Sequence, residues 1–231
     1  VFPEPGGPRD EVEPRWPADV RSLVEALDGR AAVAKLPGGL RIRTEQDSID
    51  HRGRVRPGSR GTYLLSPSSW ATQVEGYPGD TPRIDWTRNE ERGVLDGARL
   101  CGSRRAAKPG DATSWPAPIV LVFEDLERSY GDDYVPVLSR EGGKATLKLT
   151  PKRGGQNEVR IVVDLERSAI LEVGYLRRGK VVSTTVFDDF IQVAGRFLPR
   201  KVENRDADGR VVLTTRVSYE ELAGEAFARA L

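Results

Sequence analysis

The second half of the chain alternates apolar and polar residues in short runs rich in β-branched side chains. These runs are Lys144–Thr150, Glu158–Asp164, Ala169–Tyr175, Val181–Phe187 and Val211–Val217, and turn signals stand beside them at Gly142-Gly143, Gly154-Gly155, Glu166-Arg167, Arg178-Gly179 and Asp208-Gly209. A parallel crossover needs a dozen or more residues, so strands this close in sequence pair as antiparallel hairpins. The pattern predicts a meander from about Tyr134 to Tyr219 that bends into a barrel or half-barrel with one apolar face.

The first half combines one helical pattern with further strand patterns. Ala18–Asp28 places apolar residues at helical spacing, and Gly29 is available as its stop. Strands are predicted at Leu40–Asp50, Gly61–Gly76, Arg83–Thr87 and Gly93–Leu100. Within the second of these, Pro67 indicates a bulge, an edge position or a division into two strands.

Four other segments have less regular patterns. Arg99–Pro118 is polar and predicts a long loop. Pro118–Tyr130 fits a helix, although Ile119–Phe123 alone could also be a buried strand. Phe187–Pro199 predicts an interruption of the meander, and Glu220–Leu231 predicts a closing helix. Sequential strand pairing with inserted helices and no βαβ rhythm favours an α+β fold, an unclosed β-barrel (half-barrel) covered by helices.

The domain organisation follows from the proline distribution. Val1–Pro17 contains five prolines and few apolar residues, which predicts an extended lead-in or linker. Residues 18–231 are then expected to form a single half-barrel domain. Since the chain begins at Val1 and shows no secretory signal, we expect a processed form or a domain of a longer polypeptide.

Composition excludes several functional classes. The 36 basic and 35 acidic residues are interspersed, so no electrostatic footprint points to nucleic acid or to an anionic membrane surface. One cysteine and one histidine exclude an internal disulfide and a cysteine or multi-histidine metal centre. No apolar run approaches the roughly 20 residues that span a bilayer.

The motifs that could carry catalysis have simpler structural explanations. Asn204-x-Asp206-x-Asp208-Gly209 opens like a calcium loop, but Thr215 stands where the bidentate Glu is required, so a hairpin turn is predicted. The acidic pairs Asp132-Asp133 and Asp188-Asp189 are expected to be solvated, although a hydrolase could use them. His51 is expected to be an exposed residue at a strand end. We therefore predict no enzyme activity, no cofactor and no metal.

An apolar face can be either an ordinary core or a ligand cavity. Alternation selects nine candidate wall residues: Ile42, Tyr63, Leu65, Trp86, Phe123, Leu147, Ile161, Val173 and Phe187. A register error of one residue would place any of them on the opposite face. The segment Ile119–Tyr130 is the candidate lid.

Several strand motifs resemble the LolA/LolB-like outer-membrane lipoprotein-sorting superfamily. They are Leu147-Lys-Leu-Thr-Pro151, Arg160-Ile-Val-Val-Asp164, Ala169-Ile-Leu-Glu-Val, Phe197-Leu-Pro-Arg-Lys-Val202 and Asp208-Gly209-Arg210-Val211. The resemblance implies an unclosed barrel covered by helices that binds lipoprotein acyl chains in the periplasm, without enzyme activity or metal. It also implies an arginine on an early strand that contacts the lid, for which Arg41 and Arg43 are the candidates.

The sequence therefore predicts extracytoplasmic, periplasmic binding of a lipid or lipidated protein, in a carrier or sensor role. We expect a monomer without a transmembrane segment and without a nucleic-acid partner. The alternative is a non-enzymatic protein-interaction module of a larger polypeptide, in which the chain's own side chains fill the concave face.

Overall fold

The computed structural model describes residues 16–27, 36, 38–65, 70–76, 83–88, 91–96, 99–104 and 126–226. Within them, thirteen strands form one antiparallel sheet in the order β6-β5-β4-β3-β2-β1-β13-β12-β11-β10-β9-β8-β7. The strands are β1 (Gly39–Ile49), β2 (Val55–Leu65), β3 (Trp70–Gly76), β4 (Arg83–Arg88), β5 (Glu91–Asp96), β6 (Arg99–Arg104), β7 (Tyr134–Glu141), β8 (Lys144–Pro151), β9 (Asn157–Asp164), β10 (Ala169–Arg177), β11 (Lys180–Val193), β12 (Arg196–Asp206) and β13 (Val211–Leu222).

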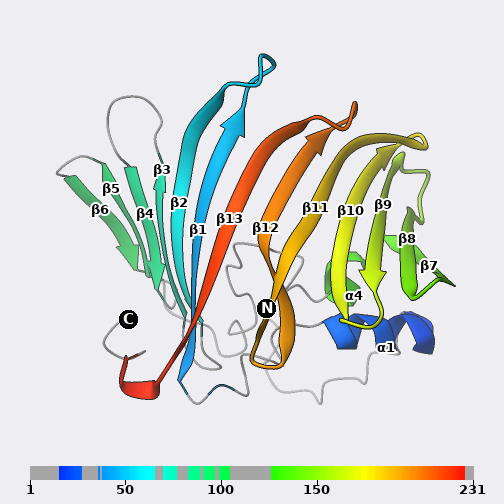
Figure 1. Cartoon of the computed structure of the whole chain (residues 1–231), viewed down its shortest axis with the longest axis horizontal. Coiled ribbons are helices and arrows are strands. Elements are labelled where there is room, and N and C mark those ends of the chain that lie inside the picture. Colours follow the sequence, from blue (N-terminus) through cyan, green and yellow to red (C-terminus); the bar gives the residue numbers. More distant parts are fainter. Residues whose placement is uncertain are drawn as a thin grey trace, which may run out of the picture.

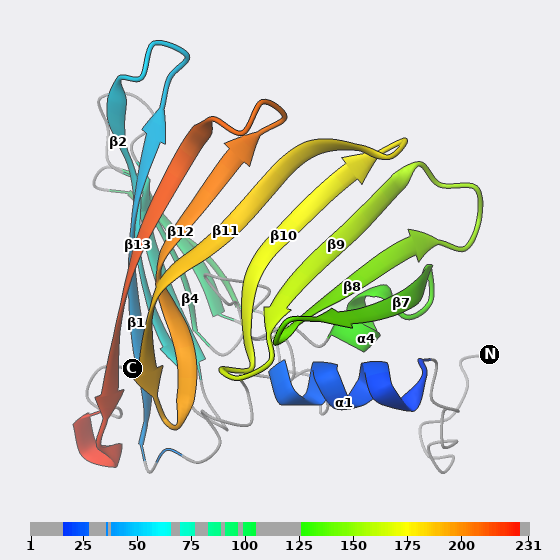
Figure 2. The same ribbon diagram turned by 45° about the vertical axis from the view of Figure 1, so that its right-hand side comes forward.

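The sheet is curved and unclosed (Figures 1 and 2). Its end strands are β6 and β7, and no pairing joins them in the described part of the chain. The pairing of β1 with β13 links the first half of the sequence to the second, with Ile42 opposite Tyr219 and Thr44 opposite Val217. The predicted unclosed antiparallel meander is thus confirmed, and the five strands predicted in the second half all form.

Two helices have described bounds, α1 (Ala18–Leu27) and α4 (Leu126–Tyr130). Helix α1 lies at the lower end of strands β7 to β10 (Figure 2) and buries Val20, Leu23, Val24 and Leu27. The predicted helix Ala18–Asp28 is therefore confirmed. Of the predicted helix Pro118–Tyr130, only Leu126–Tyr130 lies within the described residues, and it is helical. Neither helix is long and apolar enough to cross a membrane.

The predicted interruption at Phe187–Pro199 is wrong. Strand β11 continues to Val193, and β12 begins at Arg196 after a turn of Ala194 and Gly195, both with positive φ. Phe190 pairs with Pro199 in this hairpin. Asp189 adopts a φ of 53°, so the backbone absorbs a local irregularity without losing the pairing.

The predicted closing helix is wrong at its start. Glu220, Glu221 and Leu222 belong to β13, where they pair with Arg41, Leu40 and Gly39. So short a segment fits a helix pattern and a strand pattern equally well, and the presence of β1 as a partner strand determines that a strand forms. Residues 224–226 are helical, and the rest of the prediction lies outside the described residues.

Three predicted boundaries in the first half also change. Gly61–Gly76 divides into β2 and β3, one of the alternatives that Pro67 indicated. The single strand predicted at Gly93–Leu100 is wrong, because it spans the end of β5 and the start of β6. The loop predicted from Arg99 is wrong over Arg99–Arg104, which pairs with β5 as β6. Residues 105–118 lie outside the described part.

One cluster of buried residues joins α1 and α4 to the inner face of the sheet. It also includes Trp16, from the end of the predicted lead-in, whose side chain is 3% exposed. The backbone N–H of Trp16 donates a hydrogen bond of 3.2 Å to Glu127 Oε1 of α4. Packing thus ties the end of the predicted lead-in to the domain.

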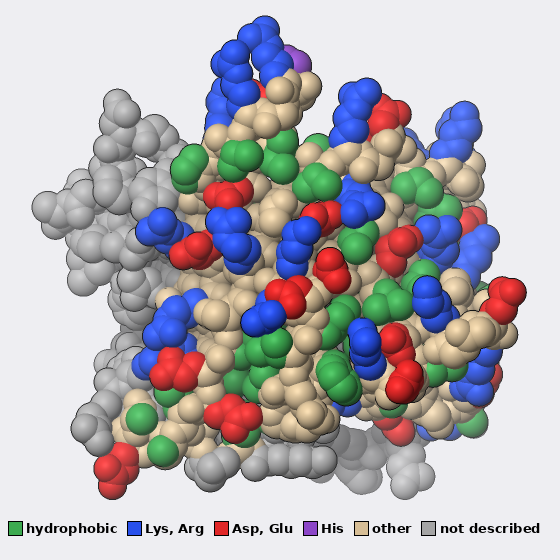
Figure 3. Space-filling view, viewed as in Figure 1, with side chains coloured by type: hydrophobic (Ala, Val, Ile, Leu, Met, Phe, Trp, Pro, Cys, Tyr) green, Lys and Arg blue, Asp and Glu red, His purple; other side chains and the backbone are tan. Residues whose placement is uncertain are grey.

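The outer face carries ion pairs that link neighbouring strands. Glu220 on β13 accepts from Arg41 at 2.9 Å and Arg43 at 3.2 Å, and Arg160 on β9 pairs with Glu172 on β10 at 2.7 Å. The face seen in Figure 3 shows basic and acidic side chains interspersed. Exposed pairs of this kind each contribute only about 0 to 1 kcal/mol to stability, so their main consequence is a solvated face.

Candidate functional site: the concave face of the sheet

The predicted wall residues with described side chains come together on the inner face. Ile42, Leu65, Leu147, Ile161 and Val173 have 0% exposure, and Phe187 is 4% exposed. Tyr63 is partly buried and packs against the same cluster. The side chain of Trp86, on β4, and the whole of Phe123 lie outside the described residues. Whether these residues bind a ligand stays a prediction.

Strand pairing explains why these side chains converge. Leu147 on β8 lies opposite Ile161 on β9, and Ile161 lies opposite Val173 on β10. At the other end of the face, Ile42 on β1 lies opposite Tyr63 on β2 and Tyr219 on β13. Directly paired residues point to the same face of an antiparallel sheet, so one correct register per strand aligns the whole set.

The same alternation identifies wall residues that the sequence analysis did not select. Val159 and Val163 flank Ile161 at intervals of two residues, and Ala145 and Leu149 flank Leu147 in the same way; all four are buried. The contributions of Trp16 and of the α1 residues depend on tertiary packing, for which the strand pattern carries no signal.

Toward the hairpin tips of β1 and β13, the inner face changes from apolar to uncharged polar. Thr44 and Thr215 are buried. Beyond them, Ser59 Oγ donates to Gln46 Oε1 at 2.7 Å, and Thr185 Oγ1 donates to Asn204 Oδ1 at 2.9 Å. The inner face therefore has an apolar part and a half-buried part of hydroxyl and amide groups.

Two tyrosines stand on either side of Ile42. Burial raises the pKa of Tyr63, an effect that its hydrogen bond with Thr44 partly offsets. Burial also raises the pKa of Tyr219 strongly. Both phenols are thus held in the neutral form, which hydrogen-bonds without bringing charge to the inner face.

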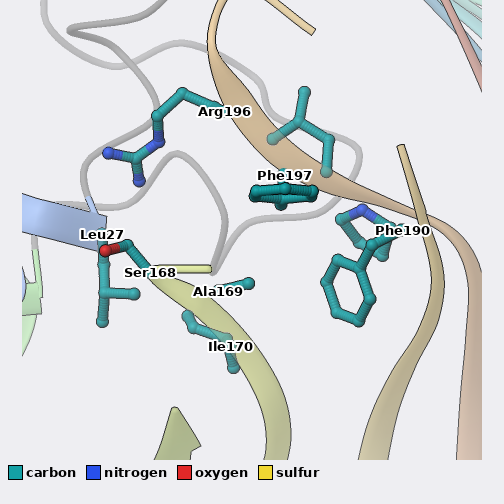
Figure 4. A pocket seen from close by; sticks show the side chains of 9 residues that line it. Leu27, Ser168, Ala169, Ile170, Phe190, Arg196 and Phe197 are labelled. Carbon is teal, nitrogen blue, oxygen red and sulfur yellow. The ribbon is translucent and has the colours of Figure 1, made fainter. Parts of the chain in front are cut away.

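A small void lies where α1 meets the sheet. Leu27, Ile170, Phe190 and Phe197 line it together with the β9–β10 turn (Figure 4). Its volume is about 10 Å³, close to the minimum that holds one water molecule. A cavity of this size cannot hold an acyl chain, so the chain's own side chains largely fill this part of the apolar face.

Arg41 and Arg43, the candidate lid contacts, alternate with Ile42 and lie on the opposite, outer face of β1. Both pair with Glu220 there. Arg41 and then Arg43 hold the pKa of Glu220 below its usual value. A contact of either arginine with residues 119–125 stays a prediction, because those residues lie outside the described part.

The other polar motifs occupy turns and strand ends. Asp206 Oδ1 accepts the backbone N–H groups of Asp208 and Arg210 at 3.0 and 2.9 Å, which confirms the hairpin turn at this motif. Asp189 pairs with Arg200 at 2.7 Å. His51 is exposed in the β1–β2 turn, as predicted. Asp132 and Asp133 are both exposed before β7.

No family model and no curated protein matches the chain. Solved structures do. A domain from Vibrio parahaemolyticus, provisionally described as an outer membrane lipoprotein-sorting protein, gives a TM-score of 0.51 at 14% identity over 90% of this chain and 96% of its own. A DUF1329 family protein from Desulfovibrio piger gives 0.54 at 14% identity, covering 89% and 94%. A LolA superfamily protein from Nitrosomonas europaea gives 0.49 at 13% identity, covering 87% and 90%.

At these identities the likeness concerns the fold. It extends over about nine-tenths of the chain. The resemblance to the LolA/LolB-like superfamily is therefore confirmed for the fold: this chain has the fold of the lipoprotein-sorting domains.

Proposed function

We propose that the chain binds a hydrophobic ligand, a lipid or the acyl chain of a lipidated protein, on the inner face of its half-barrel. The observation that carries the proposal is the convergence of Ile42, Leu65, Leu147, Ile161 and Val173 on one buried face. The shared fold with lipoprotein-sorting domains supports it. The role would be that of a carrier or sensor in an extracytoplasmic compartment, without catalysis.

Binding would require displacement of side chains or helices from this face. The void beside Leu27 is too small for an acyl chain, so α1, or the lid segment that ends in α4, would have to move. Each methylene transferred from water would then contribute about 0.8 kcal/mol. The uncharged groups of Gln46, Thr185 and Asn204 are suited to the polar end of such a ligand.

Native mass spectrometry of the purified chain, with organic extraction, would detect a ligand retained from the cell. A fluorescent fatty acid that brightens in apolar surroundings provides the titration. Asn204→Trp places a large ring on the half-buried inner face and should weaken uptake of the fatty acid. Ser218→Trp, on the exposed outer face of β13, is the matched control and should leave uptake unchanged.

The interaction module is a second candidate, because the wall residues are already buried and the described void is small. Phe187→Asp separates the two functions. A displaceable apolar face predicts a folded variant that no longer takes up the fatty acid. A self-filled core predicts that the variant unfolds. An apo mass, no fatty-acid binding and an unfolded Phe187→Asp variant would together reject the ligand-binding proposal.

A further inference from the structure

Four hairpin turns lie along one edge of the sheet (Figures 1 and 2). They join β1 to β2, β12 to β13, β10 to β11 and β8 to β9. In an antiparallel meander, alternate turns share an edge, so segments far apart in the sequence become neighbours. We call the segments 50–56, 152–157, 177–182 and 206–212 the tip edge.

The tip edge is basic although the chain as a whole is nearly neutral. Its four segments contain nine Lys or Arg residues and three Asp residues, and two further exposed acids, Asp132 and Asp133, lie beside the segment 152–157. The turn segments 141–144, 164–169 and 193–196, on the opposite edge, contain three basic and three acidic residues. Figure 3 shows basic side chains projecting at the ends of the upper hairpins. The fold therefore separates charges that the sequence intersperses.

Two of the three Asp residues in these segments accept hydrogen bonds within their own turns. Asp50 Oδ1 accepts the backbone N–H groups of Arg52 and Arg54 at 2.9 and 3.0 Å, and Asp206 Oδ1 binds its own turn in the same way. Two ion pairs within these segments are long, 3.7 Å for Arg56 with Asp50 and 3.8 Å for Arg210 with Asp208. Lys152 and Arg178 donate to uncharged acceptors, the carbonyl of Gly131 and the side chain of Gln156, so these contacts leave their positive charge unneutralised.

Exposed apolar side chains accompany these charges. Val55 is 61% exposed and stands between Arg54 and Arg56. Val182 is 49% exposed and Val212 is 40% exposed, each two residues after a basic residue that closes a turn, Lys180 and Arg210. Cationic side chains beside exposed apolar ones are the combination that binds the interfacial region of a membrane.

We propose that the tip edge docks on the surface of an anionic lipid bilayer. The basic side chains would pair with lipid phosphates, and Val55, Val182 and Val212 would enter the boundary between headgroups and acyl chains. The argument rests on the geometry of the tips, so it goes beyond ligand binding on the inner face and does not require it.

Co-sedimentation with lipid vesicles tests the proposal. The full chain should bind vesicles of phosphatidylcholine with about 30% phosphatidylglycerol and should bind pure phosphatidylcholine far more weakly, because anionic lipids supply the attraction. Binding should weaken as salt rises, because exposed charges are screened. Equal binding to both vesicle types, or no binding to either, would overturn the proposal.

Matched variants test which edge of the sheet contacts the vesicles. Arg52→Gln with Arg54→Gln should weaken binding to the anionic vesicles roughly 30-fold, from two basic contacts. Arg140→Gln with Lys144→Gln removes the same charge from the opposite edge and should leave binding nearly unchanged. Equal losses of vesicle binding in the two double variants would show a general effect of net charge and would reject the tip edge as the docking surface.

A second pair of variants tests how much the exposed apolar side chains contribute to vesicle binding. Val55→Ser should weaken vesicle binding, whereas Val137→Ser, at a 57% exposed position of β7 away from the tips, should not. Unchanged binding by Val55→Ser would reject apolar insertion at this tip. The fatty-acid titration is run on the same variants, and unchanged uptake there shows that a loss of docking is separate from ligand binding on the inner face.

Discussion

The phenolic hydroxyl of Tyr219 on β13 donates a hydrogen bond of 2.8 Å to the carbonyl oxygen of Pro199 on β12. Pro199 is fully buried, and Tyr219 packs against the core cluster opposite Ile42. A single side chain thus satisfies a buried backbone acceptor and covers the inner face. This contact gives two measurable consequences, one for substitution and one for pH.

Tyr219→Phe should lower the free energy of unfolding by about 1 to 3 kcal/mol, because the carbonyl of Pro199 would lose its side-chain partner. Urea unfolding followed by circular dichroism measures the change. Tyr219→Leu also removes part of the packed ring and should cost more. Equal stability of Tyr219→Phe and the unchanged chain would show that the hydrogen bond contributes nothing net.

Stability should fall above about pH 10. Burial raises the pKa of Tyr63 and Tyr219 above the ordinary value of 10.0, so the folded state retains protons that the unfolded state releases. Their contribution is complete below pH 10 and is lost as the pH rises beyond it. Free energies of unfolding between pH 8 and 11 measure this slope. The variant with Phe at both positions should show a shallower decline, and an identical decline would contradict the assignment.

Gly61→Ala should destabilise the fold by about 1 to 3 kcal/mol. A Cβ at Gly61 would lie 2.7 Å from Thr44 Oγ1 and 2.6 Å from Cε2 of the Tyr63 ring, so these side chains would have to move. Gly174→Ala is the control at another buried strand glycine. There the nearest atoms, in the Arg160 guanidinium, are 3.6 Å away. Thermal unfolding of both variants should separate them, with the larger loss at Gly61.

Trp16→Ala should cost about 3 to 5 kcal/mol, a range typical of truncating a large buried aromatic side chain. The ring is 3% exposed and packs in the same cluster as α1 and α4. Urea unfolding tests this, and Val137→Ala at an exposed position supplies the control. A loss below about 1 kcal/mol would show that Trp16 is only loosely attached to the domain.

Glu203 should contribute to acid sensitivity. Lys201 at 2.6 Å and Arg205 at 2.7 Å hold the pKa of Glu203 below its usual value of 4.5. Its stabilisation is therefore present above pH 4.5 and is lost as the pH falls through the lowered value. Glu203→Gln should cost up to about 1 kcal/mol at pH 7 and make unfolding less dependent on pH below 4.5. Asp208→Asn, at a highly exposed turn position, should leave that dependence unchanged.

Local patterns predicted much of the sheet because alternation and turn chemistry act over a few residues. The turns at Arg178-Gly179 and Asp208-Gly209 form where Gly provides positive φ, and the runs between turns become strands. The same alternation placed Ile42, Leu147, Ile161 and Val173 on the buried face. The errors came where a partner strand distant in the sequence determines the local structure. Glu220–Leu222, for example, form a strand because they pair with β1.

The sequence by itself determined the antiparallel meander and its apolar face, because hydrophobic periodicity and turn residues encode them locally. The tertiary structure alone decided three other features: the pairing of β1 with β13, the packing of Trp16 and α1 against the core, and the gathering of basic hairpin tips along one edge. Each depends on residues more than a hundred positions apart or on separate turns. Their proximity follows from how the sheet is ordered, which no short stretch of sequence specifies.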